Sequence, residues 1–295
     1  MSRILCCWEL GAGFGHLYRL YPLVRELMER DHQVLVATAS QANARQVFKP
    51  LALSPLEIPS QQAPFKPFPL SHNYAQILLR TGYWHQPTLR ARLQAWLRLF
   101  EACGAEFILA EHAPVALLAA RLAGLRRAAT GTGFTIPPLV TPMPGIQPWL
   151  AYPEERLQQI ETEFLGLLNP VLRGLGGEPL AAVADIFAGA EIFLCTFSEL
   201  DHYRERTQAT YYGPIVYSPP RHVLEWPRDS SRKVFLYMRA ANRFFRPLID
   251  HLGQMDLSVL ACVPDLPAAE ADALQKPHLR VVTEPVDLHQ VAEDC

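Results

Sequence analysis

Residues 11–16 read Gly11-Ala12-Gly13-Phe14-Gly15-His16, and the patterns on either side of this glycine turn decide the fold. Arg3 to Trp8 form a short apolar run, which is typical of a buried strand in a parallel sheet. From Leu17 to Met28 the apolar residues recur at the spacing that keeps one face of a helix dry, and Gln33–Ala37 is predicted as a second strand. A strand, a turn, a helix and a strand in this order predict the start of a doubly wound α/β domain.

The turn itself indicates a ligand site but not a dinucleotide site. Three alternating glycines let a ligand approach the backbone closely. The dinucleotide fingerprint would place its third glycine at position 16, where this chain has His16, and an acid at the end of the second strand, where it has Thr38. The turn therefore does not predict NAD. An alternative stays open in which the glycines only tighten a strand-to-helix turn.

The alternation of strands and helices continues along the chain between two long loops. Pro50 to Pro69 contains six prolines, and Gly131 to Pro153 is rich in glycine and proline, so both are expected to lack regular structure. The elements predicted between and beside them are helices at 73–81, 93–100 and 113–123 and strands at 107–110 and 126–130. Ligands of such parallel sheets bind beyond the carboxyl ends of the strands.

A domain boundary is predicted where prolines interrupt any regular element. We expect an N-terminal domain at residues 1–213, a linker at 214–232 and a second doubly wound domain at 233–295. Only the first half of that second domain is expected within the sequence. Its predicted elements are strands at 234–237, 257–263 and 279–282 and helices at 243–252, 268–274 and 287–294.

Composition favours a soluble enzyme of the cytoplasm. The chain has 27 Lys plus Arg against 29 Asp plus Glu, a balance that gives no electrostatic attraction to nucleic acid. Neither a membrane span nor a signal peptide is visible, although a peripheral membrane contact stays open. The cysteines lack C-x-x-C spacing and are expected to be core thiols, with neither a zinc site nor a disulfide framework, at positions 6, 7, 103, 195, 262 and 295. The sequence does not decide the oligomeric state.

Several segments carry a family resemblance when taken in order. The turn continues to Arg19 and is followed by Leu23-Val24-Arg25-Glu26-Leu27 and Asp31-His32-Gln33-Val34. Further matching segments are Ala110–Pro114, Thr132–Phe134, Tyr212–Pro214 and Glu284–Val286. Together they resemble nucleotide-sugar glycosyltransferases of the two-domain GT-B type, the group that includes glucuronosyl, macrolide and flavonoid transferases. The resemblance implies an acceptor-binding first domain and a donor-binding second domain.

The resemblance also implies a reaction and its catalytic residues. An acceptor hydroxyl is a poor nucleophile, so a base must take its proton as the anomeric carbon is attacked. His16 is the candidate base, because a helix N-terminus disfavours the imidazolium and the unperturbed histidine pKa suits neutral pH. Glu111 stands where the family commonly has an aspartate and would orient the imidazole. The implied reaction is inverting, takes a nucleoside diphosphate sugar as co-substrate, and uses no cofactor and no metal.

Acceptor and donor contacts follow from the same resemblance. Acceptor contacts are expected at Gly13, Phe14, Trp84, His112 and Phe134, and donor contacts at Gly15, Arg239, Pro285 and Val286. Other apolar residues of the long loops are expected to line the acceptor pocket, namely Phe65, Phe68, Tyr83, Ile136, Pro137, Met143 and Trp149.

Alternatives for these residues stay open. His16 could be a helix-capping histidine bonded only to the backbone, and the loop of Arg239 could have lost its donor role. His112 could serve only to shape its loop, and the aromatic loop residues could form small hydrophobic clusters beneath the loops. Arg19 could reach a phosphate, lie on a solvated helix face, or pair with Glu9 or Glu26. In the family the donor's diphosphate is bound by a turn beyond position 295, so residues 1–295 are expected to bind donor poorly. The sequence does not distinguish among lipid, polyketide, flavonoid and saccharide acceptors.

Two other function classes remain possible on the sequence. A nonhydrolysing nucleotide-sugar epimerase has the same two-domain architecture, but it needs several acidic and basic groups around one sugar, and the first-domain loops here are aromatic and proline-rich. A non-catalytic auxiliary protein could keep the fold and pair with an active partner. A reading frame that continues past Cys295 into a histidine- and glycine-rich turn would favour the transferase, and a natural stop at Cys295 would favour the auxiliary protein.

Overall fold

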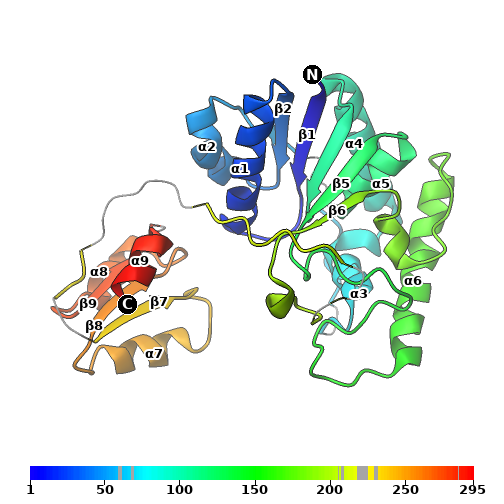
Figure 1. Cartoon of the computed structure of the whole chain (residues 1–295). Coiled ribbons are helices and arrows are strands. Elements are labelled where there is room, and N and C mark those ends of the chain that lie inside the picture. The colour runs from blue at the N-terminus through cyan, green and yellow to red at the C-terminus, as the bar shows by residue number, and fades with distance from the viewer. Residues whose placement is uncertain are drawn as a thin grey trace. The chain divides into compact units, whose positions relative to one another are not determined.

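The computed structural model divides the chain into two compact units, Met1–Tyr217 and Ser218–Cys295 (Figure 1). It describes residues 1–58, 62–67, 70–204, 206, 209–217, 225–228, 232–284 and 286–295. Among the helices of this described part, none is long and apolar enough to cross a membrane.

The first unit is built on a parallel sheet of six strands in the order β3-β2-β1-β4-β5-β6. The strands are β1 (Arg3–Trp8), β2 (Gln33–Thr38), β3 (Leu56–Glu57), β4 (Phe107–Glu111), β5 (Arg126–Gly131) and β6 (Glu191–Leu194). The strand order reverses between β1 and β4, so the connections after these two strands leave on opposite sides and open a crevice at their carboxyl ends. The residues that follow β1 and end β4 therefore lie together.

Helices cover both faces of this sheet. Successive residues of β1 point to opposite faces, so they pack against different helices. Ile4, Cys6 and Trp8 pack in one core cluster with α1 (Gly15–Glu29) and α2 (Gln41–Phe48). Leu5 and Cys7 pack in the other cluster, which is larger and contains the remaining helices of the unit. Those helices are α3 (Tyr74–Leu78), a π-helical turn (Leu79–Tyr83), α4 (Gln86–Cys103), α5 (Pro114–Leu122) and α6 (Glu154–Arg173).

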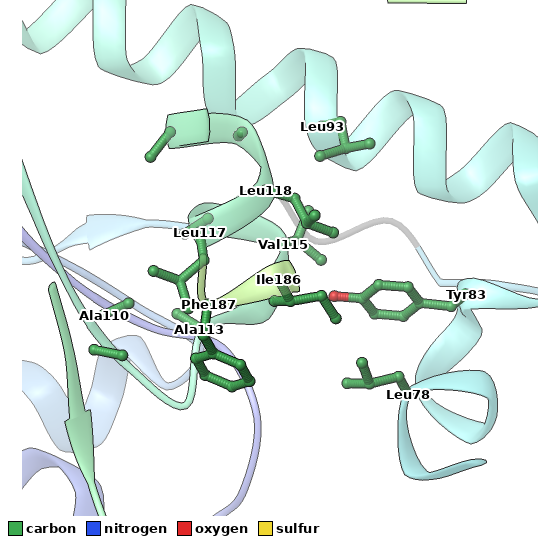
Figure 2. Close-up of a cluster of buried hydrophobic side chains, with 14 of the residues drawn as sticks. Leu78, Tyr83, Leu93, Ala110, Ala113, Val115, Leu117, Leu118, Ile186 and Phe187 are labelled. Carbon is green, nitrogen blue, oxygen red and sulfur yellow. The ribbon is translucent and has the colours of Figure 1, made fainter. Parts of the chain in front are cut away.

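The larger cluster is a densely packed core beneath α4 and α5. Figure 2 shows Leu117 and Leu118 of α5 packed beside Phe187 and Ile186, with Tyr83 directing its hydroxyl toward Ile186. Tyr83 is 1% exposed, which places a phenol deep in an apolar layer. Short 3₁₀ turns close the unit at Lys49–Leu51, Val183–Ile186 and Ser198–Leu200.

One helix and one strand, α6 and β6, lie in residues 154–212, a segment without a predicted element. In α6 the apolar residues recur every three or four positions, from Leu157 to Val171, and they are buried. Pro170 lies inside this helix, in its last turn. The strand β6 is only four residues long, so its apolar signal is brief. The proline-rich segment predicted to lack regular structure also contains β3, a two-residue edge strand.

The second unit contains a parallel sheet of three strands in the order β7-β8-β9 within its described residues. Its elements are β7 (Lys233–Tyr237), α7 (Phe245–Leu252), β8 (Ser258–Cys262), α8 (Ala268–Leu274), β9 (Leu279–Val282) and α9 (Leu288–Asp294). The central strand β8 is buried throughout, whereas β7 is only partly buried. Trp226 belongs to this unit, because its indole nitrogen lies 3.0 Å from Oδ2 of Asp294.

All six cysteines are free thiols. Those at positions 6, 7, 195 and 262 are buried, as predicted for core thiols, and burial raises the pKa of Cys6 to about 12. The prediction is wrong for Cys295, which is exposed, and Cys103 is only half-buried.

Candidate active site

The candidate site lies at the carboxyl ends of β1 and β4, where the sheet order reverses. Gly11 and Gly13 adopt positive φ angles of 108° and 78°, which only glycine takes without strain, and they turn the chain from β1 into α1. Phe14 is the N-cap residue, and no side chain of the described residues caps the helix. The first backbone N–H groups of α1 therefore face the crevice without an intrahelical partner.

The imidazole of His16 lies between the indole of Trp8 and the backbone of Gly11. The rings of Trp8 and His16 stack with centroids 5.2 Å apart and planes inclined by 20°. On another side, a β-carbon added to Gly11 would collide with Nε2 of His16. Position 11 therefore requires glycine for two reasons, its φ angle and the room that the imidazole occupies.

His16 contacts the carboxylate of Glu111 across 95 residues of sequence. Nδ1 of His16 lies 3.0 Å from Oε1 of Glu111, with the two side chains 15% and 0% exposed. A carboxylate oxygen accepts hydrogen bonds, so this contact suits the tautomer that carries its proton on Nδ1 and keeps a lone pair on Nε2. Glu111 reaches the imidazole although it is one methylene longer than the aspartate of the resembling family.

Arg19 lies one helical turn beyond His16 and binds the same carboxylate. Its Nε donates to Oε1 of Glu111 at 2.7 Å, and its Nη2 lies 2.5 Å from the same oxygen and 3.1 Å from Nδ1 of His16. The expectation that Arg19 pairs with Glu9 or Glu26 is therefore wrong. Glu26 instead pairs with Arg30 at 2.7 Å, in an exposed i, i+4 contact.

Glu9, the residue after β1, caps α5 from outside. Oε1 accepts a hydrogen bond from Nε1 of Trp96 at 2.5 Å, and Oε2 accepts one from the backbone N–H of Val115 at 2.8 Å. Burial raises the pKa of Glu9 to about 7 in spite of these hydrogen bonds. Glu9 thus has a structural role at the start of α5.

His112 lies beside His16, with ring centroids 5.9 Å apart. It has a φ of 45° and is 8% exposed, and within the described residues its Nε2 has no hydrogen-bond partner. Burial lowers its pKa to about 4, so the imidazole is neutral near pH 7. Its carbonyl accepts a hydrogen bond from the N–H of Leu10 at 3.0 Å, which ties the ends of β1 and β4 together.

Phe134 continues the row of rings toward solvent. It is 36% exposed and meets His112 edge to face at 6.3 Å and His202 at 5.3 Å. His202 Nε2 lies 2.5 Å from the carbonyl oxygen of Ile146, whose N–H donates to the carbonyl of His72 at 2.6 Å. Ring contacts and hydrogen bonds therefore connect the segments of His72, His112 and His202 with the loop that carries Phe134 and Ile146.

An ion pair holds the loop that carries Phe134. Asp201 is 7% exposed, and its Oδ2 lies 3.0 Å from Nε of Arg206 and accepts a hydrogen bond from the Tyr211 hydroxyl at 3.0 Å. Nη2 of Arg206 also donates to the carbonyl of Gly133 at 3.3 Å. A β-carbon at Gly133 would collide with the carboxylate of Asp201, so the Asp201 side chain packs directly against the backbone of Gly133.

The remaining predicted acceptor residues divide between this crevice and the core. Gly13 and Phe14 belong to the turn before α1, whereas Trp84 lies at the end of the π-helical turn, with its ring 4.9 Å from Nζ of Lys66. Tyr83 and Met143 are at most 1% exposed and pack in the large core cluster, so their prediction as pocket walls is wrong. Ile136 is also buried, but it lines a small cavity together with His112. Pro137 is buried, Phe65 and Trp149 are exposed, and Phe68 lies outside the described residues.

The predicted donor residues lie in both units. Gly15 begins α1, and a β-carbon there would meet no described atom within 4 Å, so the space beside it is open. In the second unit Arg239 follows β7 and is exposed. Val286 is 7% exposed and packs with Leu260, Cys262 and Val291, and Pro285 lies outside the described residues.

Comparisons with known proteins define the fold class. The structure matches "glycosyltransferase VinC in complex with DTDP" with a TM-score of 0.63 and 14% identity, over 99% of this chain and 74% of that one. It matches glycosyltransferase SnogD from Streptomyces nogalater with a TM-score of 0.60 and 14% identity, over 100% and 75%. It also matches spinosyn rhamnosyltransferase SpnG complexed with spinosyn aglycone, with a TM-score of 0.55 and 19% identity, over 100% and 73%.

The chain therefore has the GT-B fold of nucleotide-sugar glycosyltransferases, as the sequence predicted. No protein-family model and no curated protein matches this sequence.

Proposed function

We propose that this protein is an inverting glycosyltransferase that moves a sugar from a nucleoside diphosphate to an acceptor hydroxyl. The observation that carries the proposal is the 3.0 Å contact between Nδ1 of His16 and the buried carboxylate of Glu111 at the switch point of the sheet. A histidine oriented in this way by a carboxylate is the arrangement that a general base requires.

In the proposed reaction Nε2 of His16 takes the proton of the acceptor hydroxyl. The acceptor oxygen forms a bond to the anomeric carbon from the face opposite the diphosphate, and the bond between that carbon and the diphosphate oxygen breaks. The nucleoside diphosphate leaves with the bonding electrons. The imidazolium that forms donates from Nδ1 to Oε1 of Glu111, which stabilises its positive charge.

The surroundings of His16 support an acceptor with an apolar ring system. The row His16, His112 and Phe134 presents ring faces and edges, and Phe134 is the most exposed of the three. The unpartnered, neutral Nε2 of His112 offers one hydrogen-bond acceptor beside these rings. Two of the similar structures are named as complexes with dTDP or with spinosyn aglycone, which supports a thymidine diphosphate donor and a polyketide-type acceptor.

The open space beside Gly15 supports a donor phosphate near the start of α1. Helix N-termini bind anions through their free N–H groups and their dipole, and a side chain at position 15 would narrow this approach. Arg239 is exposed after the first strand of the second unit, and its proposed role as a donor contact rests on the family resemblance alone.

The proposal is tested by transfer and binding measurements on three proteins. Wild type, His16→Ala and Glu111→Gln are incubated with thymidine and uridine diphosphate sugars and polyketide aglycones, and products are detected by mass spectrometry. We expect a glycoside of inverted anomeric configuration from wild type, and a loss of about 10²–10⁴-fold in rate for His16→Ala with donor affinity unchanged. Transfer by His16→Ala or Glu111→Gln at the wild-type rate would contradict the proposal.

A further inference from the structure

We propose that Arg19 is a positioning residue that fixes the tautomer of His16 through the shared oxygen of Glu111. The consequence for sugar transfer rests on the function proposed above, whereas the state of the imidazole does not. Arg19 would then act without contacting the substrate.

Three polar atoms meet around one carboxylate oxygen. Oε1 of Glu111 lies 2.7 Å from Nε and 2.5 Å from Nη2 of Arg19, and 3.0 Å from Nδ1 of His16. Its other oxygen, Oε2, is buried and has no hydrogen-bond partner in the described part of the chain. All the hydrogen bonding of this carboxylate that the structure gives therefore passes through Oε1.

The charge of Arg19 keeps this oxygen an acceptor. Glu111 is 0% exposed, and a buried carboxyl without a cation favours its neutral form, because desolvation penalises the charge. The guanidinium donates to Oε1 from Nε, has Nη2 2.5 Å from the same oxygen, and supplies the compensating charge. A protonated carboxyl could instead donate to Nδ1 and leave the proton on Nε2, which would remove the base.

The position of Arg19 also allows Nδ1 of His16 to accept a hydrogen bond from Arg19 and not to donate one to Glu111. The distances among the three side chains decide between these two arrangements. Nη2 lies 3.1 Å from Nδ1, so it could donate there if Nδ1 were unprotonated. In that case the lone pairs of Nδ1 and Oε1 would face each other at 3.0 Å, which is repulsive. With a proton on Nδ1, both side chains donate to Oε1, and the Nη2–Nδ1 proximity follows from the shared acceptor.

The inference is tested on the ring nitrogens of His16 in the intact chain. Nitrogen-15 chemical shifts distinguish a protonated from an unprotonated ring nitrogen, and His16 is assigned among the 10 histidines by the signal lost in His16→Ala. The variants are Arg19→Met, which keeps the aliphatic stem, and Arg19→Lys, which keeps one charge. Arg25→Met is the matched control, because Arg25 lies on the same helix in an exposed pair with Glu29.

We expect the Nδ1–H form in wild type, in Arg25→Met and predominantly in Arg19→Lys. In Arg19→Met the ratio of Nδ1–H to Nε2–H forms should fall about tenfold or more, as loss of a charge-assisted partner would produce. Circular dichroism confirms that each variant is folded. If Arg19→Met does not fold, Arg19→Gln replaces it, since its amide keeps the length and a donor without the charge.

An unchanged tautomer ratio in the folded Arg19→Met or Arg19→Gln protein would overturn the inference, as would a wild type in the Nε2–H form. Where transfer is observed, kcat in Arg19→Met should fall about tenfold or more with the acceptor KM unchanged. Guanidinium at millimolar concentration should restore part of kcat in Arg19→Ala, because the Arg19 side chain is 21% exposed and its removal would leave a space that solvent reaches. If no variant and no wild type transfers sugar, the tautomer measurement still decides the role of Arg19.

Discussion

Trp8 stacks on His16 with ring centroids 5.2 Å apart, and so connects the last residue of β1 to the first turn of α1. The indole limits the imidazole on one face, while the backbone of Gly11 limits its Nε2 edge. Glu111 holds the remaining nitrogen. The orientation of His16 is therefore determined by packing as well as by the carboxylate, so a variant that changes only the packing should also move the imidazole.

Gly11→Ala should displace the imidazole. The new β-carbon would collide with Nε2, and the φ of 108° is strained for any other residue. We expect a loss of about 1–3 kcal/mol in unfolding free energy and, if the protein transfers sugar, about 10²-fold in kcat. Urea denaturation and steady-state kinetics measure the two effects.

The control for this variant is Gly15→Ala, where the added β-carbon meets no described atom within 4 Å. It should keep the stability and the His16 ring signals of wild type. If a donor phosphate approaches position 15, this variant alone should raise the donor KM. Equal kcat values for Gly11→Ala and wild type would refute the packing account of His16.

Asp201→Asn should loosen the loop that carries Phe134. Removing the charge leaves Arg206 without its buried partner, a change that typically costs about 3–5 kcal/mol. The N–H groups of Thr135 and Ile136, which donate to the carbonyl of Thr132 at 3.0 Å, should then exchange with deuterium faster. Hydrogen exchange read by mass spectrometry checks this.

Glu26→Gln provides the comparison for a pair at the surface. Glu26 and Arg30 are 52% and 70% exposed, so this change should alter stability by less than about 1 kcal/mol and leave exchange at residues 132–136 unchanged. Similar effects of Asp201→Asn and Glu26→Gln would show that the buried pair does not hold the loop.

The local elements could be predicted from sequence, because their signals lie within a few residues. The limits of β1 and the start of α1 follow from the apolar run, the glycine turn and helical spacing. The pairing of His16 with Glu111 spans 95 residues and was suggested only by family resemblance. Its physical basis is the register of β1 with β4, in which Trp8 is paired with Glu111.

The partner of Arg19 could not be found from sequence spacing for the same reason. Glu9 and Glu26 are near it in sequence, but the β1–β4 register brings Glu111 closer in space. The apolar residues of the long loops were equally ambiguous. Ile136 and Met143 lie in a segment rich in proline and glycine, yet both are buried, because β6 and α6, which no prediction included, complete the core around them.

His112 should make stability depend on pH below neutrality. Its pKa is about 4 in the folded protein and near 6.5 when unfolded, so the unfolded chain binds the proton more strongly. The stability from keeping this ring neutral is complete above pH 6.5 and is lost as pH falls toward 4, by about 3 kcal/mol in total. Glu9, with a raised pKa of about 7, changes stability in the opposite direction between pH 4.5 and 7.

The two contributions are separated by comparing wild type with His112→Asn, since asparagine tolerates the positive φ and does not titrate. The difference in unfolding free energy between the two proteins should shrink by about 3 kcal/mol from pH 7 to pH 4. Urea denaturation at several pH values measures it. A difference that stays constant over this range would exclude a buried neutral imidazole at position 112.

Tyr83→Phe should not destabilise the protein, although Tyr83 is among its most buried residues. The Tyr83 hydroxyl points toward Ile186 in the apolar layer (Figure 2) and has no hydrogen-bond partner among the described residues. Removing an unpaired buried hydroxyl removes a desolvation penalty of about 1–3 kcal/mol, while the ring contacts with Phe164 at 5.5 Å are kept. We expect an unchanged or higher unfolding free energy, measured by urea denaturation.

The control is Leu118→Ala, in the same layer and 0% exposed, which should lower the unfolding free energy by about 2–5 kcal/mol by leaving a cavity. A loss for Tyr83→Phe as large as that for Leu118→Ala would mean that the hydroxyl is hydrogen-bonded in solution.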